Sequence, residues 1–63
     1  MTTTAEKIRT RRRQLGLTQT EAAERAGLLQ PNWSDYESGK ASPTLVVLRR
    51  IAVALECEAG ELV

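Results

Sequence analysis

Apolar residues recur along the chain at the three- and four-residue spacing that is typical of helices. The most regular stripe follows Pro43 and consists of Leu45, Leu48, Ile51, Ala52 and Leu55. A second stripe joins Ala5, Ile8 and Leu15, but a charged residue, Arg12, interrupts it. Apolar and polar residues never alternate over four positions, and β-branched residues are few, so strands are not expected. The pattern predicts an all-α fold, a compact bundle of four to five short helices.

Capping residues and glycines indicate where these helices begin and end. Thr3 and Thr18 are each followed three residues later by a glutamate, which predicts a capping box at the start of the first two helices. Pro43 suits the first turn of the fourth helix. Glycines in a left-handed conformation are expected to end the first three helices, at Gly16, Gly27 and Gly39. The expected helices therefore cover about residues 3–15, 18–26, 30–38 and 43–55, and a weak last helix covers 58–63.

The length and composition predict one small domain that covers residues 1–63. A chain of 63 residues buries only about 60% of the surface that its unfolded form exposes, so its core is thin. Its 41% hydrophobic and 27% charged residues are ordinary for a folded soluble protein. The longest uncharged aliphatic stretch, Ala41–Leu48, is too short to cross a membrane, and the first residues lack the features of a signal peptide. We therefore expect a cytoplasmic protein with no membrane partner.

Two residue types that catalysis and metal binding often need are scarce. The chain has no histidine, the commonest acid/base catalyst and metal ligand. Its single cysteine, Cys57, cannot form an internal disulfide or a zinc site and is expected to be a buried thiol. The sequence also offers no phosphate-binding glycine loop and no evident pair of carboxylates in a cleft. We therefore expect neither an enzyme nor a protein with a cofactor, a metal or a small-molecule ligand.

Charge is unevenly distributed, although nine Lys and Arg nearly balance eight Asp and Glu to give a net charge of +1. Residues 1–20 carry a sum of +4 and residues 40–55 a sum of +3, whereas residues 21–39 and 56–63 each carry a sum of −3. Basic segments thus flank an acidic one, and the near-neutral total does not argue against a nucleic-acid partner.

Residues 18–39 combine a capped helix, a turn that contains a glycine and a second helix, which is the arrangement of a helix-turn-helix. Over about Ile8 to Leu62, the chain resembles the lambda-repressor/Cro-like (XRE-type) helix-turn-helix family. Four motifs carry the resemblance: I-R-x-x-R-x-Q-L-G-L-T-Q from Ile8, E-x-A-E-x-A-G from Glu21, W-S-x-Y-E-x-G-K from Trp33 and P-T-L-x-x-L-x-x-I-A-x-A-L from Pro43. The family consists of five-helix domains in which the second helix of the motif enters the major groove of DNA.

The resemblance implies sequence-specific binding of double-stranded DNA by a prokaryotic or phage transcriptional regulator, with repression as the expected outcome. It also implies an operator with paired half-sites and a weak homodimer on DNA, for which Leu62 and Val63 are candidate contacts. The alternative is a protein-interaction or antitoxin-like module on the same scaffold, because a fold does not by itself determine a function.

Four residues of this chain fall at the positions where members of the family contact base edges, so the resemblance implies that they contact bases. They are Gln30, Pro31, Asn32 and Asp35. Gln30 is the strongest candidate, because one amide can bond the N6 and N7 atoms of adenine together. Trp33 and Tyr36 lie on the other side of this recognition helix and are expected to belong to the core.

Phosphate contacts are carried over in the same way, to Thr18, Gln19, Arg12 and Lys40. The start of the second helix is itself favourable for an anion. Arg12 is also expected to form a largely buried ion pair with Glu37 that orients the recognition helix. The remaining basic residues of the first helix are expected to form a solvated face: Arg9, Arg11 and Arg13.

Several positions depart from the family pattern. Leu29 replaces the usual Ser or Thr at the start of the recognition helix, so we expect its cap to be missing. Ala22 and Ala26 replace larger residues, and Trp33 is expected to fill their volume. Asp35 places a negative charge on the side that faces DNA. Together with the low net charge, Asp35 predicts modest affinity for DNA and a weak dependence on salt.

Overall fold

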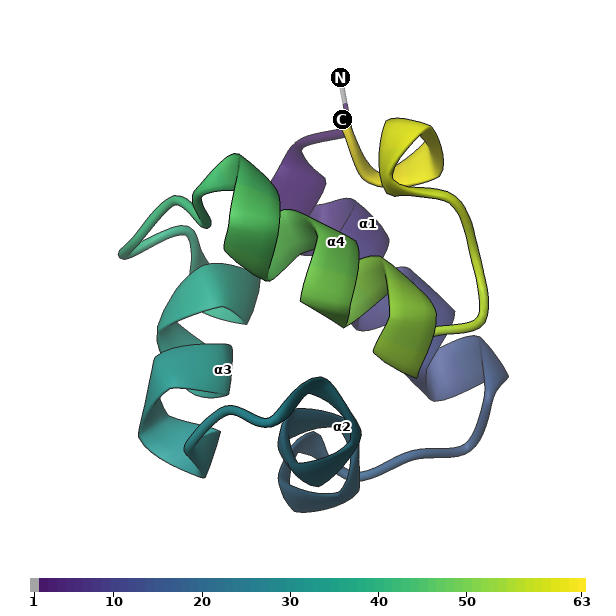
Figure 1. Ribbon diagram of the computed structural model, residues 1–63, viewed down its shortest axis with the longest axis vertical. Helices are drawn as coiled ribbons and strands as arrows, with labels where there is room; N and C mark the ends of the chain where they lie inside the picture. Colours follow the sequence, from purple (N-terminus) through teal and green to yellow (C-terminus); the bar gives the residue numbers. More distant parts are fainter. Residues whose placement is uncertain (1) are drawn as a thin grey trace.

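The computed structural model describes residues 2–63, which form four α-helices and one short 3-10 helix (Figure 1). In chain order they are α1 (Thr4–Gln14), α2 (Gln19–Ala26), α3 (Gln30–Ser38), α4 (Leu45–Ala54) and η1 (Ala59–Leu62). No strand occurs within residues 2–63, so the prediction of an all-α fold is confirmed. None of the helices in this part of the chain is both long and apolar enough to cross a membrane.

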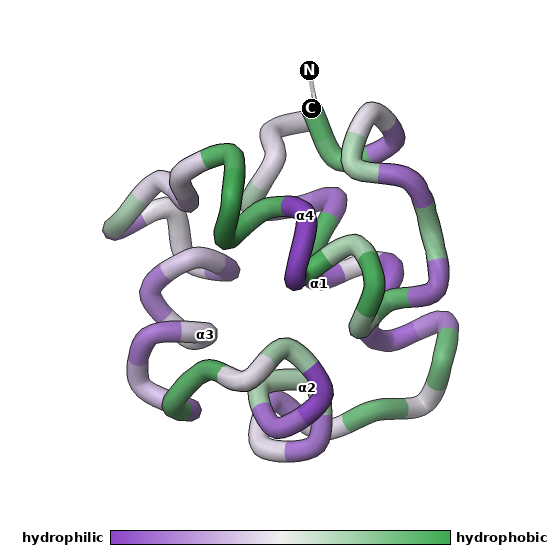
Figure 2. The backbone as a smooth tube through the Cα atoms, viewed as in Figure 1, coloured by the Kyte–Doolittle hydropathy of each residue, from purple (hydrophilic) through white to green (hydrophobic). Residues whose placement is uncertain are grey.

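The core lies where the helices pack against one another. α2 contacts both α4 and α3, α1 contacts α3, and η1 closes the bundle against α1 and α4. Figure 2 shows hydrophobic residues concentrated on α4, whereas α3 is mostly hydrophilic. The largest fully buried side chains come from α1, α3, α4, η1 and the residue directly after α4. They are Ile8, Trp33, Ile51, Leu62 and Leu55. Trp33 is 0% exposed and belongs to the same cluster as the small residues of α2, Ala22, Ala23 and Ala26.

Hydroxyl groups cap three of the four α-helices at their starts. The Thr18 hydroxyl accepts the Glu21 N–H at 3.1 Å, and Glu21 Oε1 accepts the Thr18 N–H at 2.9 Å, which completes the predicted capping box of α2. At the start of α1, Thr3 caps the Glu6 N–H at 3.2 Å. The Glu6 carboxylate, however, accepts the Thr3 hydroxyl at 3.3 Å instead of the Thr3 N–H, so only half of the expected box is present.

The end of the chain departs from the predicted helices in two places. α4 begins at Leu45 because the Thr44 hydroxyl caps the Val47 N–H at 3.3 Å, so Pro43 precedes the cap and does not occupy the first turn. The weak last helix is a single 3-10 turn, shorter than the predicted residues 58–63. It buries Leu62, which is only 2% exposed. The expectation that Leu62 contacts a second protomer is therefore wrong, because this side chain fills the protein's own core.

Three arginines bind the carboxyl ends of helices. Arg11 donates to the carbonyl oxygens of Leu55, at 2.9 Å, and of Glu56, at 3.3 Å, just after α4. Arg50 donates in the same way to Ala26, at 2.9 Å, and to Gly27, at 2.8 Å, after α2. Arg25 adds a contact to the carbonyl of Ala54 at 3.3 Å. The expectation that Arg11 lies on a solvated basic face is wrong, because the carbonyls at a helix carboxyl end need donors and attract cations.

Candidate nucleic-acid interface

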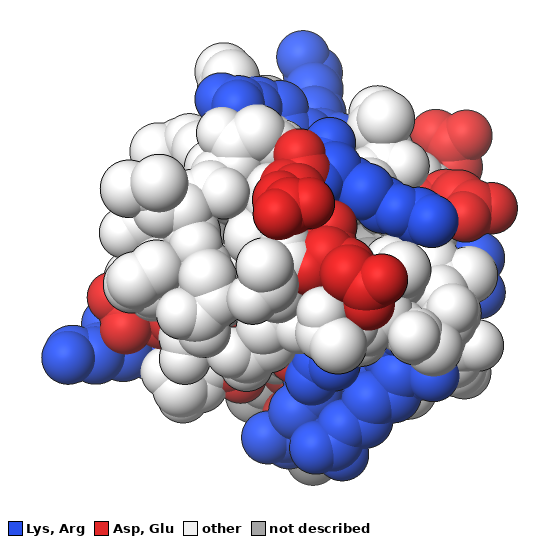
Figure 3. All heavy atoms as spheres, turned by 90° about the horizontal axis from the view of Figure 1, so that it is seen from below, with Lys and Arg blue, Asp and Glu red and all other residues white. Residues whose placement is uncertain are grey.

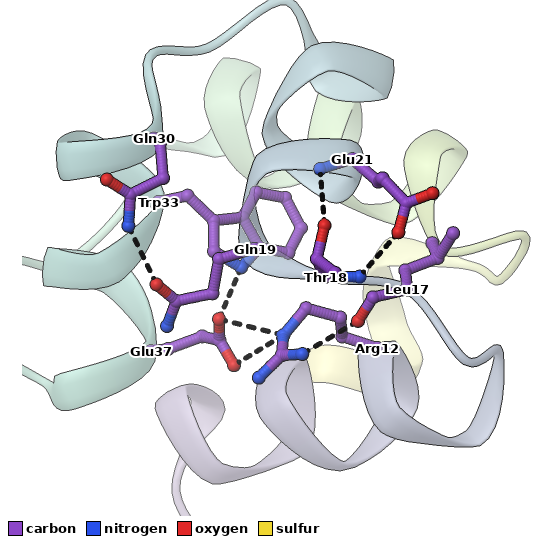
Figure 4. A network of polar contacts seen from close by, with 8 residues as sticks. All are labelled: Arg12, Leu17, Thr18, Gln19, Glu21, Gln30, Trp33 and Glu37. Carbon is purple, nitrogen blue, oxygen red and sulfur yellow. Dashed lines mark hydrogen bonds and ion pairs between the residues drawn. The ribbon is translucent and has the colours of Figure 1, made fainter.

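The turn of residues 27–29 joins the end of α2 to the start of α3, and the starts of the two helices lie close together on one side of the molecule. Gln19 and Gln30 are the first residues of these two helices. Gln30 Nε2 donates to Gln19 Oε1 at 2.8 Å, and Figure 4 shows the two side chains pointing toward each other. The structure therefore joins a predicted base contact to a predicted phosphate contact.

This hydrogen bond leaves most of the polar groups of Gln30 available. A glutamine amide has two N–H donors and one carbonyl acceptor, and only one donor is used by Gln19. Adenine presents an acceptor, N7, and a donor, N6, in the major groove. Gln30 thus keeps one N–H and its carbonyl oxygen, which match the edge of adenine, while the bond to Gln19 restricts its rotamer.

A buried polar network fixes α3 against α1. Arg12 Nε lies 3.0 Å from both carboxylate oxygens of Glu37, and Arg12 Nη1 donates to the carbonyl of Leu17 at 2.7 Å (Figure 4). The indole N–H of Trp33 donates to Glu37 Oε2. The side chains of Arg12 and Glu37 are 12% and 3% exposed. One network therefore holds α1, the segment before α2 and the recognition helix α3 in a single arrangement.

One nitrogen of the Arg12 guanidinium is not used inside the fold. Within residues 2–63, no partner is found for its Nη2 atom, and no buried side-chain nitrogen or oxygen lacks a partner. Nη2 is therefore not fully buried. This geometry is compatible with the predicted phosphate contact, although most of the guanidinium is used inside the fold.

The other predicted contacts differ in exposure. Pro31 and Asn32 are exposed in the first turn of α3, as expected. Asp35 is half-buried, so it faces solvent less than the helical pattern predicts. The Thr18 hydroxyl is engaged as the cap of α2, whereas Lys40 is exposed just after Gly39.

Charge on the face formed by α2 and α3 is divided into separate groups. Figure 3, which looks at this end of the molecule, shows basic side chains in several separate groups, with acidic side chains between and beside them. The surface on the side of α3 is largely uncharged in this view. Four basic residues are exposed and make no hydrogen bond through their side chains within residues 2–63: Arg9, Arg13, Lys40 and Arg49. The face therefore carries a weaker positive potential than the count of arginines suggests.

The remaining chemistry of the described residues does not point to a reactive site. Cys57 is half-buried, and this burial, with the nearby Glu61 carboxylate, raises the pKa of its thiol. A cysteine with a raised pKa is a poor nucleophile near neutral pH. No group of three or more potential metal ligands occurs among residues 2–63.

Comparison with known proteins agrees with this geometry. A family model described as a helix-turn-helix domain matches residues 5–63. The chain belongs to the helix-turn-helix domain family. An uncharacterized HTH-type transcriptional regulator from Methanothermobacter thermautotrophicus is 48% identical to this helix-turn-helix protein over 48 residues, 76% of this chain and 70% of the relative. The HTH-type transcriptional regulator y4dJ from Sinorhizobium fredii is 42% identical over 52 residues, 82% of this chain and 68% of the relative.

A solved structure shares the complete fold. The crystal structure of the restriction-modification controller protein C.AhdI from Aeromonas hydrophila superposes with a TM-score of 0.92 and 30% sequence identity. The match covers 95% of this helix-turn-helix protein and 91% of the controller protein. The resemblance to the lambda-repressor/Cro-like family of DNA-binding transcription regulators is therefore confirmed.

Two features of the site are not evident from the sequence. Nothing in the spacing of Gln19 and Gln30 shows that their side chains meet, although both follow directly on a predicted helix start. The indole of Trp33 also holds the Glu37 carboxylate, which the four-residue spacing of the two residues on α3 permits.

Proposed function

We propose that this helix-turn-helix protein binds double-stranded DNA with sequence specificity and regulates transcription, with α3 in the major groove. The observation that carries the proposal is the hydrogen bond between Gln19 and Gln30. It holds the amides of half-buried Gln19 and exposed Gln30 together at the starts of α2 and α3. At these places a helix that crosses the backbone and a helix that reads bases would each meet DNA. The N–H and carbonyl oxygen that this bond leaves on Gln30 match the edge that adenine presents in the major groove, which supports DNA over a protein partner.

The residues of the site divide into two groups under this proposal. Those that contact phosphates are Thr18, Gln19, Arg12 and Lys40, with the free N–H groups at the start of α2 adding a favourable dipole. Those that face base edges are Gln30, Pro31, Asn32 and Asp35. The Asp35 carboxylate can accept from an amino group such as cytosine N4, and it disfavours close approach of phosphates.

Two protomers are expected on each operator. One short recognition helix reads only a few base pairs, so useful specificity requires paired half-sites, about 34 Å apart on the same side of the duplex. Such a protein acts most simply by occupying DNA that overlaps a promoter, which makes it a repressor. Reporter expression from a promoter that contains the selected operator is then expected to fall when the protein is present.

Selection from random duplex DNA, followed by titration of the enriched sequence, tests the proposal. Gln30→Ala is expected to weaken binding to that sequence by about 1–3 kcal/mol and to relax the preference for adenine at one position of each half-site. Gln14→Ala is the matched control, because Gln14 is an exposed glutamine of α1 whose side chain faces Arg11. If no sequence is enriched and binding at about 50 mM salt is absent, the proposal is wrong and a protein partner is favoured.

A further inference from the structure

α3 begins with an exposed leucine where the other α-helices begin with a threonine. Leu29 occupies the cap position with an extended backbone, φ −79° and ψ 145°, and its side chain is 71% exposed. The caps of α1, α2 and α4 are Thr3, Thr18 and Thr44, each of which accepts a backbone N–H. Within residues 2–63, no side chain caps α3. The start of the recognition helix therefore lacks a stabilising hydrogen bond and exposes an apolar side chain.

The neighbouring residues show that the exposure of Leu29 is not needed for packing. Leu28, directly before it, is half-buried and packs against the core, so it already anchors the turn. Pro31 is also exposed, and its ring has no N–H to donate. Gln30 lies between these two apolar residues and is held by Gln19. Leu29 departs from the usual choice of a capping residue and does not improve the packing of the core. Such a departure is typical of a position that serves binding.

The apolar pair Leu29 and Pro31 has one complementary group in the major groove. Each base edge there presents hydrogen-bond donors or acceptors, and only thymine adds a methyl group, at C5. An aliphatic side chain removes this methyl group from water more completely than the polar end of a charged or amide side chain does. The surface on the side of α3 is largely uncharged in Figure 3, which leaves room for such contacts.

We propose that Leu29, with Pro31, recognises the 5-methyl group of thymine beside the adenine that Gln30 reads. The inference rests on the proposed function, since it describes the same surface in contact with duplex DNA. It assigns a reading role to the cap residue of α3. It also accounts for the missing cap, because a hydroxyl at position 29 would hold the helix start but present no comparable apolar surface.

Replacing single thymines with deoxyuridine in the selected operator tests the inference, since this removes only the 5-methyl group and keeps base pairing. Burial of one methyl group is worth about 0.8 kcal/mol, which corresponds to about a fourfold change in Kd. We expect a weakening of about fourfold at one or two thymines of each half-site, next to the adenine of Gln30. Replacement at thymines outside these positions is expected to leave Kd unchanged.

Variants of the protein connect this sensitivity to Leu29. Leu29→Ala is expected to discriminate between the thymine and uracil operators by clearly less than fourfold, because the methyl group loses most of its apolar partner and keeps only the contact with Pro31. Val53→Ala is the control: Val53 is 76% exposed on α4, and this variant is expected to keep the fourfold preference for thymine. Circular dichroism spectra that match the wild type establish that both variants are folded.

The outcomes separate the two proposals. If no operator can be selected, the proposed function fails. If an operator is selected and the wild type binds it with the same Kd after its thymines are replaced by deoxyuridine, the proposed function stands. The reading of thymine by Leu29 is then wrong. A preference for thymine that persists unchanged in Leu29→Ala also overturns the inference, because another residue then contacts the methyl group.

Discussion

At the scale of single residues, the stability of α3 and the proposed recognition of thymine favour different residues at position 29. Leu29→Ser is expected to stabilise the protein by about 0.5–2 kcal/mol, because a serine hydroxyl at the start of α3 accepts one of the N–H groups that have no partner in the helix. Urea denaturation measures the change. Leu29→Ala is the control and should leave stability nearly unchanged, since alanine offers no acceptor. Equal stability of the serine and alanine variants would show that the missing cap does not matter.

Glu21 gives the protein a pH-dependent contribution to stability. Hydrogen bonds from the Thr18 N–H and the Thr18 hydroxyl hold the pKa of the Glu21 carboxyl below its ordinary value of 4.5. Between the folded and unfolded pKa values the unfolded chain binds more protons, so this stabilisation is present above 4.5 and is lost as the pH falls through the folded pKa.

Glu21→Gln tests this contribution, because glutamine keeps the shape of the capping box but cannot ionise. The wild type is expected to be the more stable protein at neutral pH, and the difference should shrink as the pH falls below 4.5. Thermal denaturation at a series of pH values measures it. A difference that stays constant across this range would show that the charge of Glu21 makes no contribution.

At the scale of elements, the network around Arg12 determines how α3 is placed. Arg12→Ala leaves Glu37, 3% exposed, without its cation, and breaking a buried pair in this way typically costs about 3–5 kcal/mol. We expect thermal denaturation at a much lower temperature. Arg13→Ala, on the exposed side of the same helix, should change stability by less than about 0.5 kcal/mol. If the two variants melt alike, the ion pair does not hold α1 and α3 together.

Two glycines at helix ends allow the contribution of Arg50 to be isolated. Gly16 and Gly27 have similar left-handed backbones, with φ of 71° and 69°. A methyl group at Gly16 would meet nothing within 4 Å, whereas one at Gly27 would clash with Arg50 Nη2 and displace it. Gly16→Ala is expected to cost about 1–2 kcal/mol of backbone strain.

Gly27→Ala should cost about 1 kcal/mol more than Gly16→Ala, because it also disrupts the bonds from Arg50 to the end of α2. Chemical denaturation of both variants measures the difference. In an Arg50→Ala background the extra cost of Gly27→Ala should disappear. If it remains there, the loss comes from the backbone at Gly27 alone.

At the scale of the whole molecule, the sequence predicts the helices well because their signals are local. Capping threonines, left-handed glycines and the apolar stripe of α4 each act within a few residues, and α2 and α3 begin and end close to where these signals place them. The contacts that the sequence does not predict join residues that are far apart in the chain. Arg11 reaches Leu55 and Arg50 reaches Ala26, because a long side chain can serve a distant helix end.

The same limit applies to the candidate site. Sequence patterns identify Gln30 and Arg12 as special residues, since one begins a helix and the other interrupts an apolar stripe. The bond to Gln19 and the burial of Arg12 depend on how α1, α2 and α3 pack, which no local signal contains. Arg11, Arg25 and Arg50 likewise look available for DNA until the structure shows them bound to carbonyl groups.

This use of arginines inside the fold leads to a prediction about the response to salt. Few cations remain for phosphates, so the affinity for DNA should fall only shallowly with salt, by about 0.9 in log K per log unit of salt for each phosphate neutralised. Lys40→Ala removes one exposed cation after α3 and should lower this slope by about one per protomer. Arg49→Ala removes an exposed cation from α4, which lies apart from the starts of α2 and α3 (Figure 1), and should leave the slope unchanged. Titration of the selected operator at several salt concentrations measures all three proteins, and an equal loss of slope in both variants would mean that α4 also contacts DNA.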